Sequence, residues 1–159
     1  MSSTLLTSWS AYDDALQQIL DLSLTTLLIF DRDLSALKLE QPQRADSLQR
    51  ILAARRATTR LAIIVQNAGS IERDSPRLMN LLATYFPAMT ITVAPPQLST
   101  LSDSLLIADD KHALIRFHHQ QARSRLIIDE AEECRPYFER FSAIVDEGGD
   151  PVSPSTLGL

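Results

Sequence analysis

Six charged or imidazole side chains stand where a predicted strand ends or a predicted helix begins, and these residues could perform chemistry. They are Asp31, Asp33, Arg77, Asp109, Arg116 and His118. In α/β sheets, polar side chains that converge beyond the strand ends commonly line a ligand-binding cleft. Since guanidinium groups bind phosphate and carboxylate oxygens, we expect this cleft to take a small anionic or phosphate-containing ligand. The alternative is an internal ion-pair network that caps loops, which is common where no catalysis occurs.

Residues 74–76, with the sequence Asp-Ser-Pro, predict the start of a helix, and Arg73 and Arg77 flank this start. Unpaired backbone N–H groups and the helix dipole favour an anion at such a position. We therefore expect Arg77 to contribute to the anion site together with Arg116.

Three histidines, His112, His118 and His119, lie close to Asp109 in the sequence and suggest a metal site. Adjacent residues of a strand point to opposite faces, so His118 and His119 cannot readily share one ion. We therefore expect no metal and no other cofactor. A nucleophile and base pair of Ser102 with either of these two histidines also lacks the flanking glycines of a nucleophile elbow.

Apolar periodicity predicts the elements that must position these residues. In chain order they are a helix over residues 9–20, a strand over 24–30, a helix around 48–52, a strand over 61–65, a helix over 76–85, a strand over 89–93, a hairpin with arms 104–108 and 113–117, a strand over 125–128, and a helix around 137–145. This order predicts an α/β fold with a mixed sheet flanked by helices. Two interpretations of Pro136 stay open, because it either kinks the last helix or occupies its first turn.

The chain has 159 residues, of which 45% are apolar and 22% are charged, the size and composition of one domain. We assign residues 1–147 to this domain. Residues 148–159 are rich in Gly, Pro and Ser, and we expect them to form a loop or an extended tail. The single cysteine, Cys134, cannot form an internal disulfide.

Residues 101–145 resemble one half of a phospholipase D superfamily member. In that family a strand carries the pattern His-x-Lys-x-x-x-x-Asp, a hairpin follows, and the return strand ends in a Gly-Ser-x-Asn-like turn. When Asp109 is aligned with the aspartate of the motif, Ser102 stands at the histidine position and Ser104 at the lysine position. Residues 116–119, Arg-Phe-His-His, stand where the family has its turn. The resemblance implies a single phospholipase D-like domain.

The same resemblance implies loss of the usual chemistry. In an active member a histidine attacks phosphorus, a lysine holds the non-bridging oxygens, and the aspartate orients a histidine. Neither Ser102 nor Ser104 can replace these groups, so we expect a non-catalytic binding or regulatory module. The alternatives are a divergent phosphodiester hydrolase or transferase that uses His118 or His119 with Asp109, and a purely interactional role. Single halves in the superfamily tend to pair, so the resemblance also implies a homodimer.

The whole chain also resembles an uncharacterised bacterial family with this fold, which brings no established activity. The features that carry this resemblance are residues 30–34, residues 75–78, residues 107–110 with Arg116, and the terminal residues 156–159.

Twenty acidic and fifteen basic residues give a net charge of −5, which argues against general attraction to nucleic acid or to an anionic membrane. The clearest basic cluster consists of Arg44, Arg50, Arg55, Arg56 and Arg60. A solvated helix face is the favoured explanation, because aromatic residues that could stack on bases are not interleaved with these arginines. Nucleic-acid binding is the less favoured alternative.

Residues 1–14 lack the basic segment and long apolar run of a secretory signal. The apolar runs of the chain fall short of the roughly 20 residues that a membrane-spanning helix needs. We therefore expect no membrane span. A single thiol is compatible with a reducing compartment, and we expect a cytoplasmic location.

Overall fold

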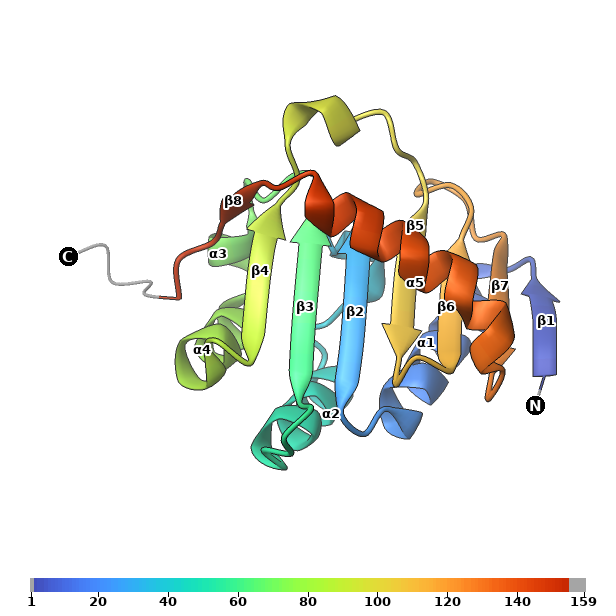
Figure 1. Ribbon diagram of the computed structural model, residues 1–159, viewed down its shortest axis with the longest axis horizontal. Helices are drawn as coiled ribbons and strands as arrows, with labels where there is room; N and C mark the ends of the chain where they lie inside the picture. The colour runs from blue at the N-terminus through green and yellow to red at the C-terminus, as the bar shows by residue number, and fades with distance from the viewer. Residues whose placement is uncertain (1, 155–159) are drawn as a thin grey trace.

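An eight-stranded mixed β-sheet forms the centre of the computed structural model, which describes residues 2–154 (Figure 1). The strands are β1 (Ser2–Leu6), β2 (Thr26–Asp31), β3 (Arg60–Val65), β4 (Met89–Val93), β5 (Ser104–Ala108), β6 (His112–Arg116), β7 (Ser124–Ile128) and β8 (Asp150–Pro151). Their spatial order is β1-β7-β6-β5-β2-β3-β4-β8. Strands β2, β3 and β4 are parallel, and every other pairing is antiparallel.

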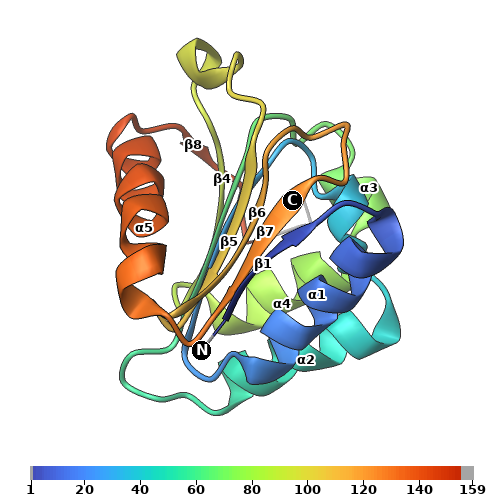
Figure 2. The same ribbon diagram turned by 90° about the vertical axis from the view of Figure 1, so that its right-hand side faces the viewer.

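Helices cover both faces of the sheet. They are α1 (Trp9–Leu22), α2 (Pro42–Ala53), α3 (Ile71–Asp74), α4 (Pro76–Tyr85) and α5 (Ala131–Asp146), with short 3-10 turns at Ser35–Leu37 and Pro96–Leu98. Figure 2 shows α5 alone on one face and α1 to α4 on the other. The predicted fold class, a mixed sheet flanked by helices, is confirmed.

Strand alternation divides the core between the two faces. On β2, Leu27 and Ile29 pack with the cluster beneath α1, α2 and α4, whereas Leu28 and Phe30 pack with the cluster beneath α5. Successive side chains of a strand point to opposite faces, and a strand covered on both faces must be apolar throughout. This requirement explains the nearly continuous apolar run that predicted β2 from the sequence.

The strand directions define two edges of the sheet. The upper edge, as drawn in Figure 1, carries the carboxyl ends of β2, β3, β4 and β6 and the amino end of β5. The lower edge carries their opposite ends. In the antiparallel pairing of β2 with β5, Phe30 lies opposite Leu105 and Leu27 lies opposite Ala108. A residue before β5 therefore lies at the upper edge, and a residue after it lies at the lower edge.

Two edge strands were not predicted. The exposed strand β1 pairs with β7, and β8 pairs with β4 within the segment expected to be a loop or extended tail. Val152 also donates its N–H to the carbonyl of Ile91 at 2.8 Å. Both pairings depend on backbone groups of a neighbouring strand, which the local sequence does not reveal. Residues 156–159, which contributed to the resemblance above, lie outside the described residues.

The interpretation of Pro136 is decided by α5. The helix begins at Ala131, so Pro136 lies inside it and does not occupy the first turn. Within residues 2–154, no helix has both the length and the apolar character needed to span a bilayer.

Cys134 lies on the side of α5 that packs against the sheet and is 0% exposed. Burial, assisted by the negative charge of Glu133, raises the pKa of its thiol to about 11. Both effects disfavour the reactive thiolate.

We expect Cys134 of the folded protein to be unreactive towards Ellman's reagent at about pH 8, where an ordinary free thiol with a pKa of about 8.5 reacts readily. In urea, where the chain unfolds, one thiol per chain should react. The absorbance of the released thionitrobenzoate measures both conditions. Rapid labelling of the folded protein would contradict the buried position.

Candidate functional site

A buried ion pair lies at the upper edge of the sheet. Asp31 ends β2 and Arg116 ends β6, on either side of β5, whose first residue is Ser104. The Oδ1 atom of Asp31 accepts hydrogen bonds from Ser104 Oγ at 2.6 Å and from Arg116 Nη2 at 3.1 Å. None of the three residues is more than 2% exposed. The structure thus brings Asp31 and Arg116 together through two antiparallel pairings, that of β2 with β5 and that of β5 with β6.

The turn after β2 holds the second oxygen of Asp31. Asp31 Oδ2 accepts the backbone N–H groups of Asp33 at 3.2 Å and Leu34 at 2.7 Å. The carboxylate of Asp33 is used separately, because its Oδ1 accepts the N–H and the hydroxyl of Ser35. Short acidic side chains commonly form such local turns. Asp33 therefore supports the turn and does not contact Arg116, contrary to the prediction that it lines a common cleft.

Two aromatic rings of α1 cover the guanidinium group. Arg116 Cζ lies 4.9 Å from the ring centroid of Tyr12 and 5.5 Å from that of Trp9. Tyr12 is buried, and burial raises the pKa of its hydroxyl to about 12 despite the nearby positive charge of Arg116. Trp9 is 46% exposed and therefore forms the outer part of this cover. Neither ring was predicted to belong to the site. Their spacing of about one helical turn indicated only that Trp9 and Tyr12 share a face of α1.

Arg116 is incompletely paired. Its Nε and Nη1 atoms are buried and make no hydrogen bond of good geometry among the described residues, although the Tyr12 hydroxyl lies within reach of the guanidinium group. A guanidinium group offers five N–H donors in a planar fork, and buried donors in proteins are almost always satisfied. The arrangement therefore contains a positive group held from one side by Asp31 and able to donate further hydrogen bonds.

Asp109 lies at the lower edge, which corrects its predicted place in the cleft. Its Oδ1 accepts the backbone N–H groups of Thr25 and Thr26, and its Oδ2 accepts that of Leu24, at 2.9–3.0 Å. Since β5 runs antiparallel to β2, the residue after β5 lies beside the start of β2 and a full strand length from Asp31. Partial burial raises the pKa of the Asp109 carboxyl group, but the hydrogen bonds outweigh this effect and lower it.

Arg77 lies at the start of α4, as predicted, but an internal carboxylate occupies the anion position. Glu40 accepts the N–H groups of Arg77 and Leu78, both at 3.0 Å. The neighbouring Arg73 pairs with Asp74. The Arg77 guanidinium group lies 3.4 Å from the carbonyl oxygen of Glu40, and the structure does not bring it together with Arg116. Glu40, thirty-seven residues earlier in the chain, gave no local signal of this role.

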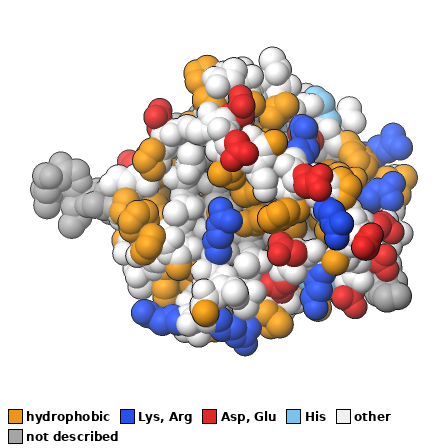
Figure 3. Space-filling view, viewed as in Figure 1, with side chains coloured by type: hydrophobic (Ala, Val, Ile, Leu, Met, Phe, Trp, Pro, Cys, Tyr) orange, Lys and Arg blue, Asp and Glu red, His pale blue; other side chains and the backbone are white. Residues whose placement is uncertain are grey.

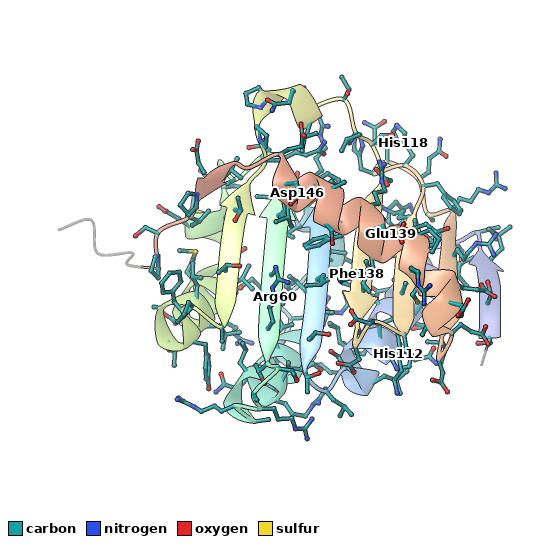
Figure 4. The ribbon with its side chains drawn as sticks, in the orientation of Figure 1. Arg60, His112, His118, Phe138, Glu139 and Asp146 are labelled. Carbon is teal, nitrogen blue, oxygen red and sulfur yellow. The ribbon has the colours of Figure 1, made fainter. Side chains whose placement is uncertain are left out.

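The histidines are divided between the two edges. His118 and His119 follow β6 at the upper edge, whereas His112 begins β6 at the lower edge, where its Nδ1 accepts the N–H of Asp129 (Figure 4). The rings of His118 and His119 stack with centroids 4.6 Å apart. His119 donates its N–H to the carbonyl of Ser102 at 2.6 Å, and its buried Nδ1 has no partner among the described residues. The contact with Ser102, which occupies the histidine position of the motif, is thus made by the backbone amide of His119 and not by its imidazole.

We expect Asp31 and Arg116 to be strongly coupled in stability. Asp31→Asn or Arg116→Met should each lower the free energy of unfolding by about 3–5 kcal/mol, because each leaves one buried charge without its partner. The double variant should lose much less than the sum. Urea denaturation of all four proteins gives the coupling energy. The matched control is the exposed pair of Arg73 and Asp74, whose coupling should stay below about 1 kcal/mol. Equal coupling in the two pairs would contradict the buried interaction.

Asp109→Asn should lower the free energy of unfolding by about 1–2 kcal/mol at pH 7, because one backbone N–H loses its acceptor. Asp110→Asn is the matched control, since both residues have positive φ, 53° and 58°, and Asn tolerates this conformation. The control should change stability by less than about 0.5 kcal/mol. Urea denaturation measures both, and equal losses would contradict a specific role for Asp109.

The difference in the free energy of unfolding between the wild type and Asp109→Asn should depend on pH. The pKa of Asp109 is lower in the folded than in the unfolded chain, so its ionised form stabilises the fold above the unfolded pKa. The advantage of the wild type over Asp109→Asn should therefore shrink as the pH falls through the folded pKa, below about pH 4.

The fold is similar to that of several solved structures. Nuc from Salmonella typhimurium, a phospholipase D family member, has a TM-score of 0.60 and 14% identity, over 96% of this chain and 100% of that chain. NucT from Helicobacter pylori has a TM-score of 0.60 and 13% identity, over 94% of this chain and 98% of that chain. At these identities the likeness shows the fold alone, which is phospholipase D-like.

A third similar structure is that of TrmBL2, an archaeal chromatin protein with a novel mode of DNA binding. It has a TM-score of 0.64 and 12% identity, over 94% of this chain and 54% of that chain, so the present chain spans about half its length. No curated protein sequence matches the chain. One family model matches residues 9–150, and its family is described as Domain of unknown function (DUF7931). Because this match covers most of the sequence, the chain belongs to that family.

Proposed function

We propose that the protein is a non-catalytic phospholipase D-like module that binds a small phosphate-containing anion at Arg116. The observation that carries this proposal is the pair of buried Arg116 donors, Nε and Nη1, that lack partners among the described residues. Nε–H and Nη1–H point to different sides of the guanidinium group, so each could donate one hydrogen bond to an anion, either singly or in a fork shared with Nη2. Asp31 holds the third nitrogen, Nη2, and so fixes the orientation of the fork.

The residue types support binding without turnover. Ser102 and Ser104 stand at the histidine and lysine positions of the motif, and Ser104 directs its hydroxyl to Asp31. The positive charge at the upper edge comes instead from Arg116 on the adjacent strand. An arginine stays protonated and is not a nucleophile, so it can hold an anion but cannot form a phosphoryl-enzyme intermediate.

Trp9 supports the same proposal through its position. It covers the guanidinium group with one side and is half-exposed on the other. Tyr12 is fully packed and cannot move without disturbing the core, whereas Trp9 is the first residue of α1. An anion that reaches Arg116 would therefore displace the ring of Trp9 and leave that of Tyr12 in place.

A divergent phosphodiester hydrolase is the second candidate. The observation in its favour is the buried Nδ1 atom of His119, which has no partner among the described residues, on a residue whose backbone pairs with that of Ser102. Asp109 cannot orient this histidine, because it caps the start of β2 at the opposite edge. The second candidate therefore lacks the aspartate that the sequence analysis assigned to it.

The fluorescence of Trp9, the single tryptophan of the chain, tests the proposal directly. Inorganic phosphate should change its emission saturably, whereas chloride at equal ionic strength should not. Arg116→Lys should weaken phosphate binding at least about tenfold, because lysine keeps the charge but loses the planar fork. Arg125→Lys is the matched control and should bind like the wild type. An absent or unsaturable response would overturn the proposal.

A turnover assay separates the two candidates. We expect no hydrolysis of bis(4-nitrophenyl) phosphate above the buffer rate. Hydrolysis that disappears in His119→Asn and persists in His112→Asn would favour the divergent hydrolase.

A further inference from the structure

A second basic surface lies at the lower edge of the sheet, and we call it the lower basic surface. It consists of Arg55, Arg56, Arg60, Tyr85 and Phe86. Arg55 and Arg56 follow α2, Arg60 begins β3, and the aromatic residues stand at the end of α4. The amino ends of β3 and β4 bring these segments together, far from the ion pair at the upper edge.

The fold separates these arginines from the rest of the basic cluster. Arg44 is buried and pairs with Asp13, and Arg50 donates to the carbonyls of Leu20 and Ser23 at the end of α1. These two arginines join α2 to α1. Only the remaining three are available to bind a partner.

The three remaining arginines are exposed and lack acidic partners. Within residues 2–154, none of Arg55, Arg56 and Arg60 forms an ion pair, although five such pairs are present elsewhere. Arg55 stacks on Tyr85 with its Cζ 5.5 Å from the ring centroid. Arg56 makes one long hydrogen bond to the carbonyl of Leu24, at 3.3 Å. The surface therefore carries uncompensated positive charge in a chain whose net charge is −5.

Phe86 stands between two hollows. One, of about 510 Å³, is lined by Arg55, Arg56 and Tyr85 together with Phe86. The other, of about 310 Å³, has Arg60 and Phe86 at its rim. Phe86 is 50% exposed, so its ring is open to a planar partner between positive groups on both sides.

The second hollow lies against β3 and β4 beside the end of α5. Ala62, Ile64, Thr90 and Thr92 of the two strands line it together with Val145 of α5. Arg60 lies over the face of β3 (Figure 4), and Figure 3 shows basic and hydrophobic side chains side by side along the lower rim of this face. The hollow therefore lies directly beside the ring of Phe86 and the side chain of Arg60.

We propose that the lower basic surface binds single-stranded nucleic acid, with a base stacked on Phe86 and neighbouring phosphates held by the three arginines. Single strands offer unpaired bases next to phosphates, which aromatic rings and arginines recognise together. A duplex keeps its bases stacked inside, and a lipid headgroup has no planar ring. Aromatic residues are not interleaved with the arginines in the sequence, but the fold brings two rings from the end of α4 beside them.

The test uses the full chain and a fluorescently labelled oligodeoxythymidylate in an anisotropy titration at low salt. The wild type should bind, and its affinity should fall as salt rises. The triple variant Arg55→Gln, Arg56→Gln, Arg60→Gln should bind at least about tenfold more weakly and show a shallower salt dependence, because each lost phosphate contact reduces the slope by about 0.7. Phe86→Leu should weaken binding roughly 5- to 100-fold with an unchanged slope, since stacking involves no counterion release.

The matched control is the triple variant Arg73→Gln, Arg123→Gln, Arg135→Gln, which removes the same charge from other exposed positions. It should bind like the wild type, because these three arginines lie outside the lower basic surface. Equal weakening in the control would show general charge attraction and overturn the proposal. Absence of wild-type binding at low salt would also overturn it. Adsorption to anionic vesicles that needs the same three arginines, without oligonucleotide binding, would assign the surface to membranes instead.

Discussion

The buried ion pair of Asp31 and Arg116 is the constraint on which the upper half of the structure depends. It joins β2 to β6 across β5, and the rings of Tyr12 and Trp9 add α1 to the same cluster. Removing two charges from water is costly, so such a pair persists only where hydrogen bonds and packing hold it in good geometry. Here Ser104 and the turn after β2 provide those hydrogen bonds for Asp31. Arg116 makes fewer hydrogen bonds than Asp31, because its Nε and Nη1 atoms have no partner among the described residues. This difference between the two residues is the reason for proposing that the pair has more than a structural role.

At the upper edge, the positive charge lies on β6, whereas the phospholipase D motif places its lysine on the strand that corresponds to β5. The motif places its lysine at the position of Ser104, whereas this chain carries its cation at position 116, which pairs with Ser104 in the hairpin. Arg116 lies beside the position at which the motif has its lysine. Under the proposed function this cation would hold the anion, with no nucleophile at position 102.

At two other places in the structure, a carboxylate of the protein itself accepts the free backbone N–H groups that could otherwise bind an anion. Glu40 occupies the start of α4, and Asp109 occupies the unpaired amides before β2. Both are carboxylates from distant parts of the sequence that stabilise exposed N–H groups. The charged groups left available to a ligand are therefore few, and they lie at opposite edges of the sheet. Arg116 is buried under a half-exposed ring, and the lower basic surface is open to solvent.

Apolar periodicity in the sequence was sufficient to predict the order of the central elements and the α/β class, because this periodicity is local and a strand buried on both faces must be apolar at every position. It also placed Asp31, Arg116 and Asp109 at strand ends. Only the tertiary structure decided which strand ends share an edge, since this depends on the antiparallel direction of β5 relative to β2. The same holds for Glu40 on α4, for Trp9 over Arg116 and for Phe86 between the arginines. Each of these contacts joins residues far apart in the chain, and no local pattern encodes a partner that only the packing of the whole chain brings near.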